Sequence, residues 1–394
     1  MTMGPMLAFF LICLVMAAGD YISVKTKAFV PSVFVSATLF LLGFWYFLPL
    51  DLSKIAGLEG NIVAVTLLVL IVHMGTLMNV DELIAEWRSI VVALAGLLGM
   101  GVFLLTLGRH LVGWEAVVTG TPPLMGGGLA AIIMSEAAKA KGLEDLAVLS
   151  IVIFVMQGFV GYPLTAFALK KEGRRLLALY NSAGGAEALP AQQAASENER
   201  FRIFKPMPEQ FATPFILFAK FSLVAYLTVL FTDLTGEFVN RYVTALIFGA
   251  VASQIGFLER KPLLKSASFG FFILCQMTFL LTQLNRATPE MLLSIFKLLC
   301  IIIAVGVAGL VLFAWAAGKF LGYSGAMSIA TALTALYGFP PNYILTEEAA
   351  RALASNPEER QFLMDRLLPK MLVGGFTTVT VASVVIAGLF VKLY

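Results

Sequence analysis

The segment TPPLMGGGLAAIIMSE, residues 121–136, constrains the fold more than any other feature, because two prolines and three consecutive glycines interrupt long apolar runs. Apolar segments of membrane-spanning length flank it on both sides. In lipid, each unpaired backbone N–H or C=O costs several kcal/mol, so irregular backbone at membrane depth must be covered by protein or line a watery cavity. The sequence therefore predicts a buried chain break between spanning helices, which is typical of a transporter's binding site.

The composition agrees with a membrane location. The chain is 59% hydrophobic and 13% charged, with a mean hydropathy of +0.90, whereas soluble domains carry about 25% charged residues. The sequence predicts an all-α polytopic membrane protein without a cleaved signal peptide or a soluble domain. Three cysteines lie in apolar runs and are interpreted as small buried hydrophobes rather than disulfide or metal ligands.

A spanning helix needs about 20 apolar residues, and this rule predicts about ten. In the first half the predicted helices are 3–19, 29–50, 61–80, 89–112 and 143–170, with a Gly-rich hairpin at 116–138 before the last. In the second half they are 213–232, 240–258, 263–284, 290–319 and 362–392, with a hairpin at 323–349.

The two hairpin segments repeat one another. The first starts with Gly113-Trp114 and ends in SEAAKA, the second starts with Gly322-Tyr323 and ends in TEEAARA, and Gly127 corresponds to Gly338. An odd number of helices in each half places the halves in opposite orientations, which is an inverted repeat. The predicted organisation is a first repeat over 1–170, a linker over 171–212 and a second repeat over 213–394.

Basic residues predict the orientation. With the linker in the cytoplasm, lysines and arginines on the cytoplasmic side outnumber those outside by more than two to one, as the positive-inside rule requires. Both termini are then outside a cell (inner) membrane. The first re-entrant hairpin enters from outside and the second from the cytoplasm, so the two meet near the midplane.

The hairpins contain most of the candidate site residues. Glycines allow a ligand to approach the backbone, and a half-helix after Gly128 would direct free N–H groups at an anion. Oxygen ligands suit Na⁺ as a coupling ion. The predicted substrate-binding residues are Thr121, Gly126, Gly127, Gly128, Ser135, Thr334, Tyr337, Gly338, Asn342 and Lys370, and the predicted Na⁺ ligands are Asn79, Gln157 and Thr331.

Two intramembrane features have alternative interpretations. His73 and its counterpart Gln276 form either a proton or cation relay or hydrogen bonds between neighbouring helices. Lys370, about two turns into the last predicted helix, either binds a carboxylate or extends its ammonium to the interface.

These features together resemble the bacterial sodium/glutamate symporter family and the related sodium/2-hydroxycarboxylate symporters. The resemblance is carried by MGTLMNVDEL at 74–83, the glycine run 126–128, YGFPPN at 337–342 and the closing VKLY. It implies two inverted five-helix repeats with re-entrant hairpins, a homodimer, and elevator-like transport of small carboxylates with Na⁺. The chain lacks that family's histidine in the glycine run and its acidic residue in the last helix, where Thr377, Thr378 and Thr380 stand.

The sequence thus predicts a secondary transporter, Na⁺-coupled, for a small organic anion such as glutamate or a di- or hydroxycarboxylate. The alternatives are an uncoupled or H⁺-coupled uniporter or exporter, and a receptor or scaffold without transport. No cofactor and no nucleic-acid partner is expected. The absence of G-x-S-x-G, H-E-x-x-H and Walker motifs argues against an enzyme and against nucleotide-driven pumping.

Overall fold

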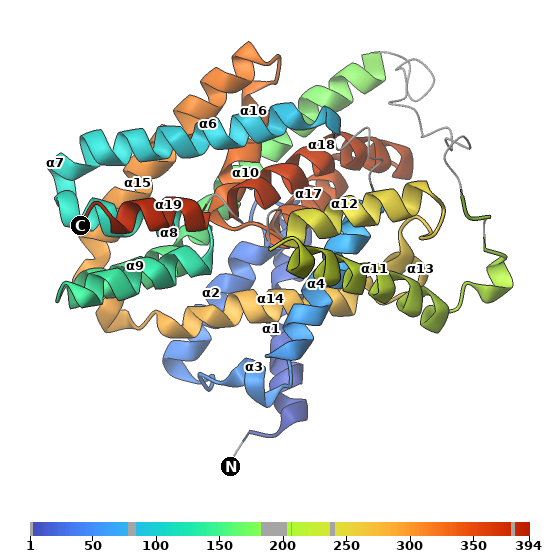
Figure 1. Cartoon of the computed structure of the whole chain (residues 1–394), viewed down its shortest axis with the longest axis horizontal. Coiled ribbons are helices and arrows are strands. Elements are labelled where there is room, and N and C mark those ends of the chain that lie inside the picture. Colours follow the sequence, from blue (N-terminus) through green and yellow to red (C-terminus); the bar gives the residue numbers. More distant parts are fainter. Residues whose placement is uncertain (1–2, 78–83, 183–202, 206, 237–240, 380–382) are drawn as a thin grey trace. The chain divides into compact units, whose positions relative to one another are not determined.

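The chain is all-α in the computed structural model (Figure 1), which describes residues 3–77, 84–182, 203–205, 207–236, 241–379 and 383–394. Five helical runs are long and apolar enough to cross a membrane, which indicates a membrane location. They are α1 (Pro5–Lys25), the run Trp87–Val112, α10 (Glu144–Ser182), α11 (Pro214–Leu234) and α15 (Pro289–Phe320).

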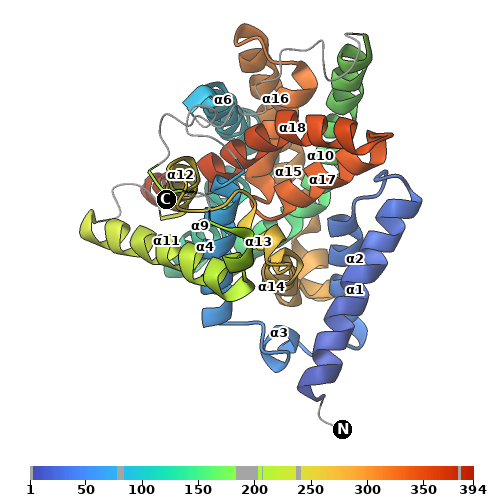
Figure 2. The same cartoon turned by 90° about the vertical axis from the view of Figure 1, so that its right-hand side faces the viewer.

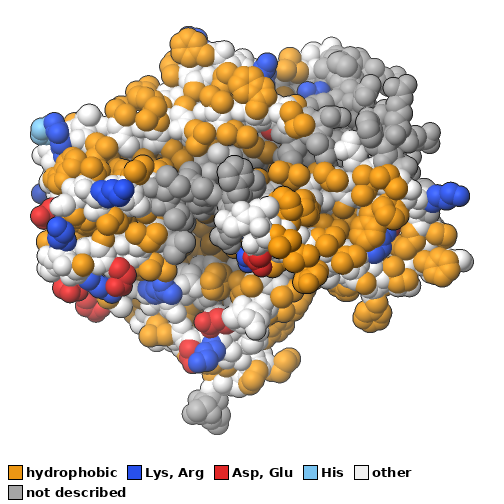
Figure 3. Space-filling view, viewed as in Figure 1, with side chains coloured by type: hydrophobic (Ala, Val, Ile, Leu, Met, Phe, Trp, Pro, Cys, Tyr) orange, Lys and Arg blue, Asp and Glu red, His pale blue; other side chains and the backbone are white. Residues whose placement is uncertain are grey.

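The run Trp87–Val112 shows how such helices present apolar side chains outward. It consists of α6 (Trp87–Phe103), a π-helical turn (Leu104–Gly108) and α7 (Arg109–Val112). Leu94, Leu98 and Leu107 on this run are 44%, 63% and 50% exposed. Figure 3 shows hydrophobic side chains over much of α6, with charged side chains near its α7 end. An apolar outer face of this kind suits contact with lipid.

Contacts divide the chain into two compact units, which are described separately. The first comprises residues 1–52, 87–179 and 281–394, and the second residues 53–86 and 180–280. Besides the runs given above, the first contains α2 (Ser32–Tyr46), α8 (Trp114–Leu124), α9 (Gly128–Ala140), α16 (Gly325–Leu333), α17 (Pro341–Leu353), α18 (Pro357–Thr377) and α19 (Ser383–Val391). The second contains α4 (Asn61–Gly75), α11, α12 (Arg241–Gln254), α13 (Pro262–Lys265) and most of α14 (Phe269–Thr282).

In the first unit, α6 and α15 cross through glycines. A side chain on Gly99 would collide with the Gly309 carbonyl and the Phe313 ring, and one on Gly309 would collide with the Gly99 carbonyl and Phe103. The Phe103 and Phe313 rings meet edge to face, 6.3 Å apart. Because both helices carry glycine at the crossing, their backbones approach closely, as in other tightly packed membrane helices.

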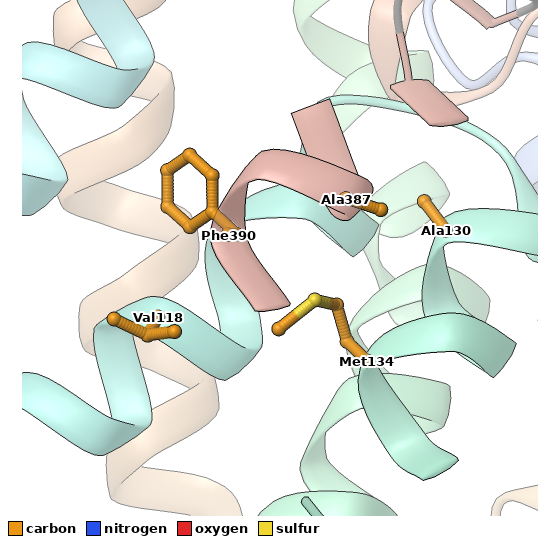
Figure 4. Close-up of a cluster of buried hydrophobic side chains, with 5 residues drawn as sticks. All are labelled: Val118, Ala130, Met134, Ala387 and Phe390. Atoms are coloured by element: carbon orange, nitrogen blue, oxygen red, sulfur yellow. The ribbon is translucent and has the colours of Figure 1, made fainter. Parts of the chain in front are cut away.

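Two helix–turn–helix segments lie in the same unit. We name α8–α9 hairpin 1 and α16–α17 hairpin 2. The arms of hairpin 1 pack on each other and on α19, where Val118, Ala130, Met134, Ala387 and Phe390 form a buried cluster (Figure 4). Both arms of hairpin 2 pack on α18, and Figure 2 shows α17 alongside it.

The predicted helix 362–392 corresponds to α18 and α19, and residues 380–382 between them lie outside the described part of the chain. Two other predictions need correction. The predicted linker begins as helix, since α10 continues to Ser182; there Gly173 packs against Leu353 of hairpin 2. The predicted helix 263–284 is split into α13 and α14, and at the split the Ser266 hydroxyl bonds the Leu263 carbonyl at 3.2 Å.

Candidate functional site

Two breaks between helices meet the end of α18 at one place in the first unit. A Cβ atom on Gly126 would lie 3.1 Å from the carbonyl oxygen of Ala335 and 3.3 Å from that of Thr378. A Cβ atom on Gly338 would lie 3.0 Å from Cγ2 of Val379. We name this place the junction and define it as residues 125–128 between the arms of hairpin 1, 334–340 between the arms of hairpin 2, and 377–379 at the end of α18.

On the hairpin 1 side of the junction, the backbone is irregular and the second helix starts without a cap from any described side chain. Pro122 and Pro123, in the last turns of α8, have no backbone N–H, and Gly126 and Gly127 take φ angles of +122° and +86°, which residues with a side chain rarely adopt. α9 begins at Gly128 with no side-chain cap among the described residues. The first N–H groups of a helix lack intrahelical partners and carry its positive dipole end. This end of α9 therefore presents hydrogen-bond donors at the junction.

The hairpin 2 side is closed by its own side chains. The Asn342 side chain accepts the Tyr343 backbone N–H at 2.7 Å and donates to the Met371 carbonyl of α18 at 3.0 Å. The Thr334 hydroxyl donates to the Thr331 carbonyl at 2.6 Å. Pro341 occupies the first helical position of α17. Asn342 and Thr334 were both predicted to bind substrate, but Asn342 fastens the turn to α18 and the Thr334 hydroxyl bonds within its own hairpin.

α10 packs beside the junction. A Cβ atom on Gly128 would lie 3.2 Å from the Phe154 ring, and one on Gly161 would lie 2.9 Å from the Tyr337 ring. Gln157 stands between Phe154 and Gly161 on the same helix face, because residues three and four apart are neighbours on a helix. Its side chain is 2% exposed and its amide oxygen has no hydrogen-bond partner. A buried acceptor without a partner is costly and calls for an explanation such as a ligand or an ion.

A second unpartnered oxygen lies on hairpin 2. Thr331 is fully buried on α16, and its hydroxyl has no hydrogen-bond partner. Its methyl group and carbonyl pack against Gly374 of α18, three residues before that helix ends at Thr377. Gln157 and Thr331, which the sequence assigned to a cation, therefore provide buried oxygens near the junction.

The sequence did not predict two residues that contact Tyr337. The Tyr337 hydroxyl donates to the Thr165 hydroxyl at 2.8 Å, and its ring lies 5.3 Å from that of Tyr162. Gln157, Gly161 and Thr165 follow one another at four-residue intervals along α10. That spacing was the available signal, since it puts all three on one helix face.

Other predicted residues lie away from the junction or outside the described chain. Thr121 donates to the Val117 carbonyl within α8 at 2.7 Å, and Ser135 is buried on α9, two turns beyond Gly128. The Lys370 ammonium lies 5.8 Å from the centre of the Tyr323 ring, which precedes α16 at the end remote from the junction. Asn79 falls outside the described residues.

Buried carboxylates hold the outer ends of hairpin 2. Glu172 of α10 accepts the hydroxyl of Ser324, the residue that caps α16, and also pairs with Arg175 at 2.6 Å. Glu348 of α17, which is 3% exposed, accepts the Ser32 backbone N–H at the start of α2, with both oxygens at 3.2 Å. These carboxylates fix both arms of hairpin 2 to neighbouring helices.

In the second unit, His73 and Gln276 join neighbouring segments. His73 Nδ1 accepts the Leu263 N–H at 3.3 Å, and Gln276 Nε2 donates to the Val63 carbonyl at 2.7 Å and to the Thr66 hydroxyl at 2.6 Å. Of the two interpretations, the structure shows hydrogen bonds between helices.

No protein-family model matches the chain, and no curated protein matches its sequence. The functional assignment therefore depends on the junction and on the residues around it.

Proposed function

We propose that this chain is a secondary active transporter that moves a small organic anion across a cell membrane together with Na⁺. The junction is the observation that carries the proposal. Irregular backbone is tolerated at membrane depth where protein or a water-filled cavity surrounds it, and broken helices of this kind bind substrates and ions in secondary transporters.

An inverted repeat of five helices per half is part of the proposal. The α6–α15 crossing supports it, because its contacts are reciprocal. Gly99 of α6 faces Gly309 and Phe313 of α15, and Gly309 in turn faces Gly99 and Phe103 of α6. The two pairs are separated along the chain by nearly the same distance as the two hairpins. Reciprocal contacts of this kind are those expected beside a two-fold axis.

The final helices of the two halves support the same symmetry. α10 contacts hairpin 1 through Ser150, whose hydroxyl donates to the Ala131 carbonyl at 2.8 Å, and then hairpin 2 through Thr165 and Glu172. α18 contacts hairpin 2, and α19 contacts hairpin 1. Each half thus supports its own hairpin and then the other. In the proposed topology both termini are outside, hairpin 1 enters from outside and hairpin 2 from the cytoplasm.

Coupling to Na⁺ is supported by the oxygens around the junction. Gln157 and Thr331 supply buried oxygens without hydrogen-bond partners, and a hard cation prefers oxygen ligands. The start of α9 supplies donors to the carboxylate. Following the family resemblance, we propose a homodimer and an elevator-type movement that exposes the junction to each side in turn.

The test is transport by the purified protein in liposomes. Labelled carboxylates and amino acids are offered with an inward Na⁺ gradient, and then with choline replacing Na⁺. Na⁺-dependent accumulation is expected, together with counterflow when unlabelled substrate is trapped inside. Counterflow that is equal with and without Na⁺ would indicate a uniporter or exporter. Binding without any flux would indicate a receptor. Either result contradicts the proposal.

A further inference from the structure

The side chains around the junction carry no positive charge. Gln157, Tyr162, Thr165, Thr331 and Tyr337 are neutral and buried. Among all the residues that the structure describes, no lysine or arginine is buried. A carboxylate bound at the junction is therefore not met by a buried basic side chain from this part of the chain.

The buried acids of the first unit lie elsewhere. Glu172 and Glu348 contact Ser324 and Ser32 at the outer ends of hairpin 2, as described above. Glu359 lies in the first turn of α18, where its carboxylate accepts the Ser355 N–H at 2.7 Å. These groups bind backbone or side-chain donors and add no positive charge to the junction.

The remaining positive potential is limited to about one charge. A helix N-terminus carries roughly half of a positive elementary charge and a C-terminus roughly half of a negative one. α9 and α17 begin at the junction, and α8 and the turn after α16 end there, so the charges of these helix ends roughly cancel. A single coupled Na⁺ supplies one positive charge. This is sufficient for one carboxylate with its cation, but it leaves a second carboxylate without a partner. Burying an unpaired carboxylate is strongly unfavourable.

Two buried oxygens near the junction are available to a ligand. Gln157 and Thr331 are 2% and 0% exposed, and their amide and hydroxyl oxygens have no hydrogen-bond partner in the described protein. They can accept hydrogen bonds from a ligand or ligate a cation, but as neutral groups they cannot neutralise a second negative charge.

We infer that the substrate is a small monocarboxylate, and that dicarboxylates of the same carbon skeleton are rejected. This inference rests on the proposed function and narrows it. It excludes the second carboxylate that glutamate and the dicarboxylates would bring to the junction, and it keeps the one carboxylate at the start of α9 and the cation at Gln157 and Thr331.

The experiment compares matched substrate pairs in liposomes containing the intact protein. The pairs are 2-hydroxypropanoate with 2-hydroxybutanedioate, and alanine with aspartate, which differ by one carboxylate. The expected kcat/KM is at least about 100-fold higher for the monocarboxylate of the transported pair, because the extra charge would be buried unpaired. A dicarboxylate transported within threefold of its partner would overturn the inference and leave the proposed function standing.

Lowering the pH provides a second test of the same inference. Carboxyl groups titrate near pH 4, so the singly charged fraction of a dicarboxylate rises about tenfold for each pH unit below 7. Its competition for monocarboxylate uptake should strengthen by the same factor between pH 7 and pH 6, while the KM of the monocarboxylate stays constant. Competition that is independent of pH would contradict the inference. If neither member of any pair is transported or raises the Tm, the proposed function itself fails.

Discussion

Hairpin 1 and hairpin 2 reach the same junction but differ in how their turns are built. Hairpin 1 turns through Gly126 and Gly127, and its second arm starts without a side-chain cap among the described residues. Hairpin 2 turns through Gly338 and two prolines, and Asn342 fastens its second arm to α18. Hairpin 1 thus faces the junction with a helix start that no described side chain caps, and hairpin 2 faces it with a turn whose side chain is hydrogen-bonded.

The outer ends of the hairpins differ as well. Hairpin 2 is attached through buried carboxylates, Glu172 and Glu348. Hairpin 1 is attached by contacts to the last residues of the chain, since Trp114 Nε1 donates to the Leu393 carbonyl at 3.1 Å and Lys141 Nζ to the Tyr394 carbonyl at 3.5 Å. The difference agrees with the roles that we propose. Hairpin 1 would offer backbone hydrogen-bond donors, and hairpin 2, whose arms are fixed by Glu172 and Glu348, would offer side-chain oxygens.

The largest expected effect comes from adding one methyl group to hairpin 1. Gly126→Ala should lower transport at least about 100-fold, because its Cβ would press on the Ala335 carbonyl and the backbone would be strained by about 1–3 kcal/mol. The control is Gly142→Ala, at a φ of +74° with open space around it. Transport is measured per folded, reconstituted protein. Equal transport by the two variants would remove Gly126 from the proposed site.

The bracing of hairpin 2 should show in stability. Glu348→Ala leaves the buried Ser32 N–H without its acceptor and should reduce the free energy of unfolding by about 1–3 kcal/mol, measured by denaturant titration in detergent. Glu136→Ala in hairpin 1 removes a pair with Lys139 in which the side chains are 67% and 49% exposed. That pair should contribute less than about 1 kcal/mol. Equal losses would mean that the two hairpins are held alike.

Two amides at the junction should behave in opposite ways. Asn342→Leu removes two hydrogen bonds and should cost about 1–3 kcal/mol of stability. Gln157→Leu removes an unpartnered buried oxygen, so Tm without ligand should stay constant or rise, while the Na⁺ concentration for half-maximal transport rises roughly tenfold, about 1.4 kcal/mol. Unchanged Na⁺ dependence in Gln157→Leu would show that this amide is not a ligand.

The smallest expected effect is a loss of stability that is equal for matching variants in the two halves of the chain. Phe103→Leu and Phe313→Leu each replace one ring of the reciprocal pair at the α6–α15 crossing and should cost about 1 kcal/mol. Thermal unfolding of the two variants measures the difference. Unequal shifts in Tm would show that the asymmetry of the hairpins extends to this crossing.

The helices were predictable where apolar length decided them. The predicted helix 290–319 corresponds to α15, Pro289–Phe320, and the break at Gly126–Gly128 was found from its prolines and glycines. The contacts of Thr378 and Val379 with Gly126 and Gly338 were not predicted, because they join distant parts of the chain.

The site residues were likewise predictable only from local features. Gln157 and Thr331 were predicted as cation ligands because their side chains contain oxygen. The sequence also supplied Asn342 and Thr334, which the structure shows bonded to their own hairpin or to α18. Residue type cannot separate a polar group that binds its neighbours from one that is left without a partner, because the partners come from other helices.

The sequence by itself determined the long apolar helices and the glycine turn at 126–128, since these depend on local length and backbone freedom. Only the tertiary structure decided that Glu172 and Glu348 brace hairpin 2, that Thr165 receives the Tyr337 hydroxyl and that no basic side chain is buried among the described residues. Burial and hydrogen bonding are properties of the packed chain, and residues far apart in the sequence supply both sides of each contact.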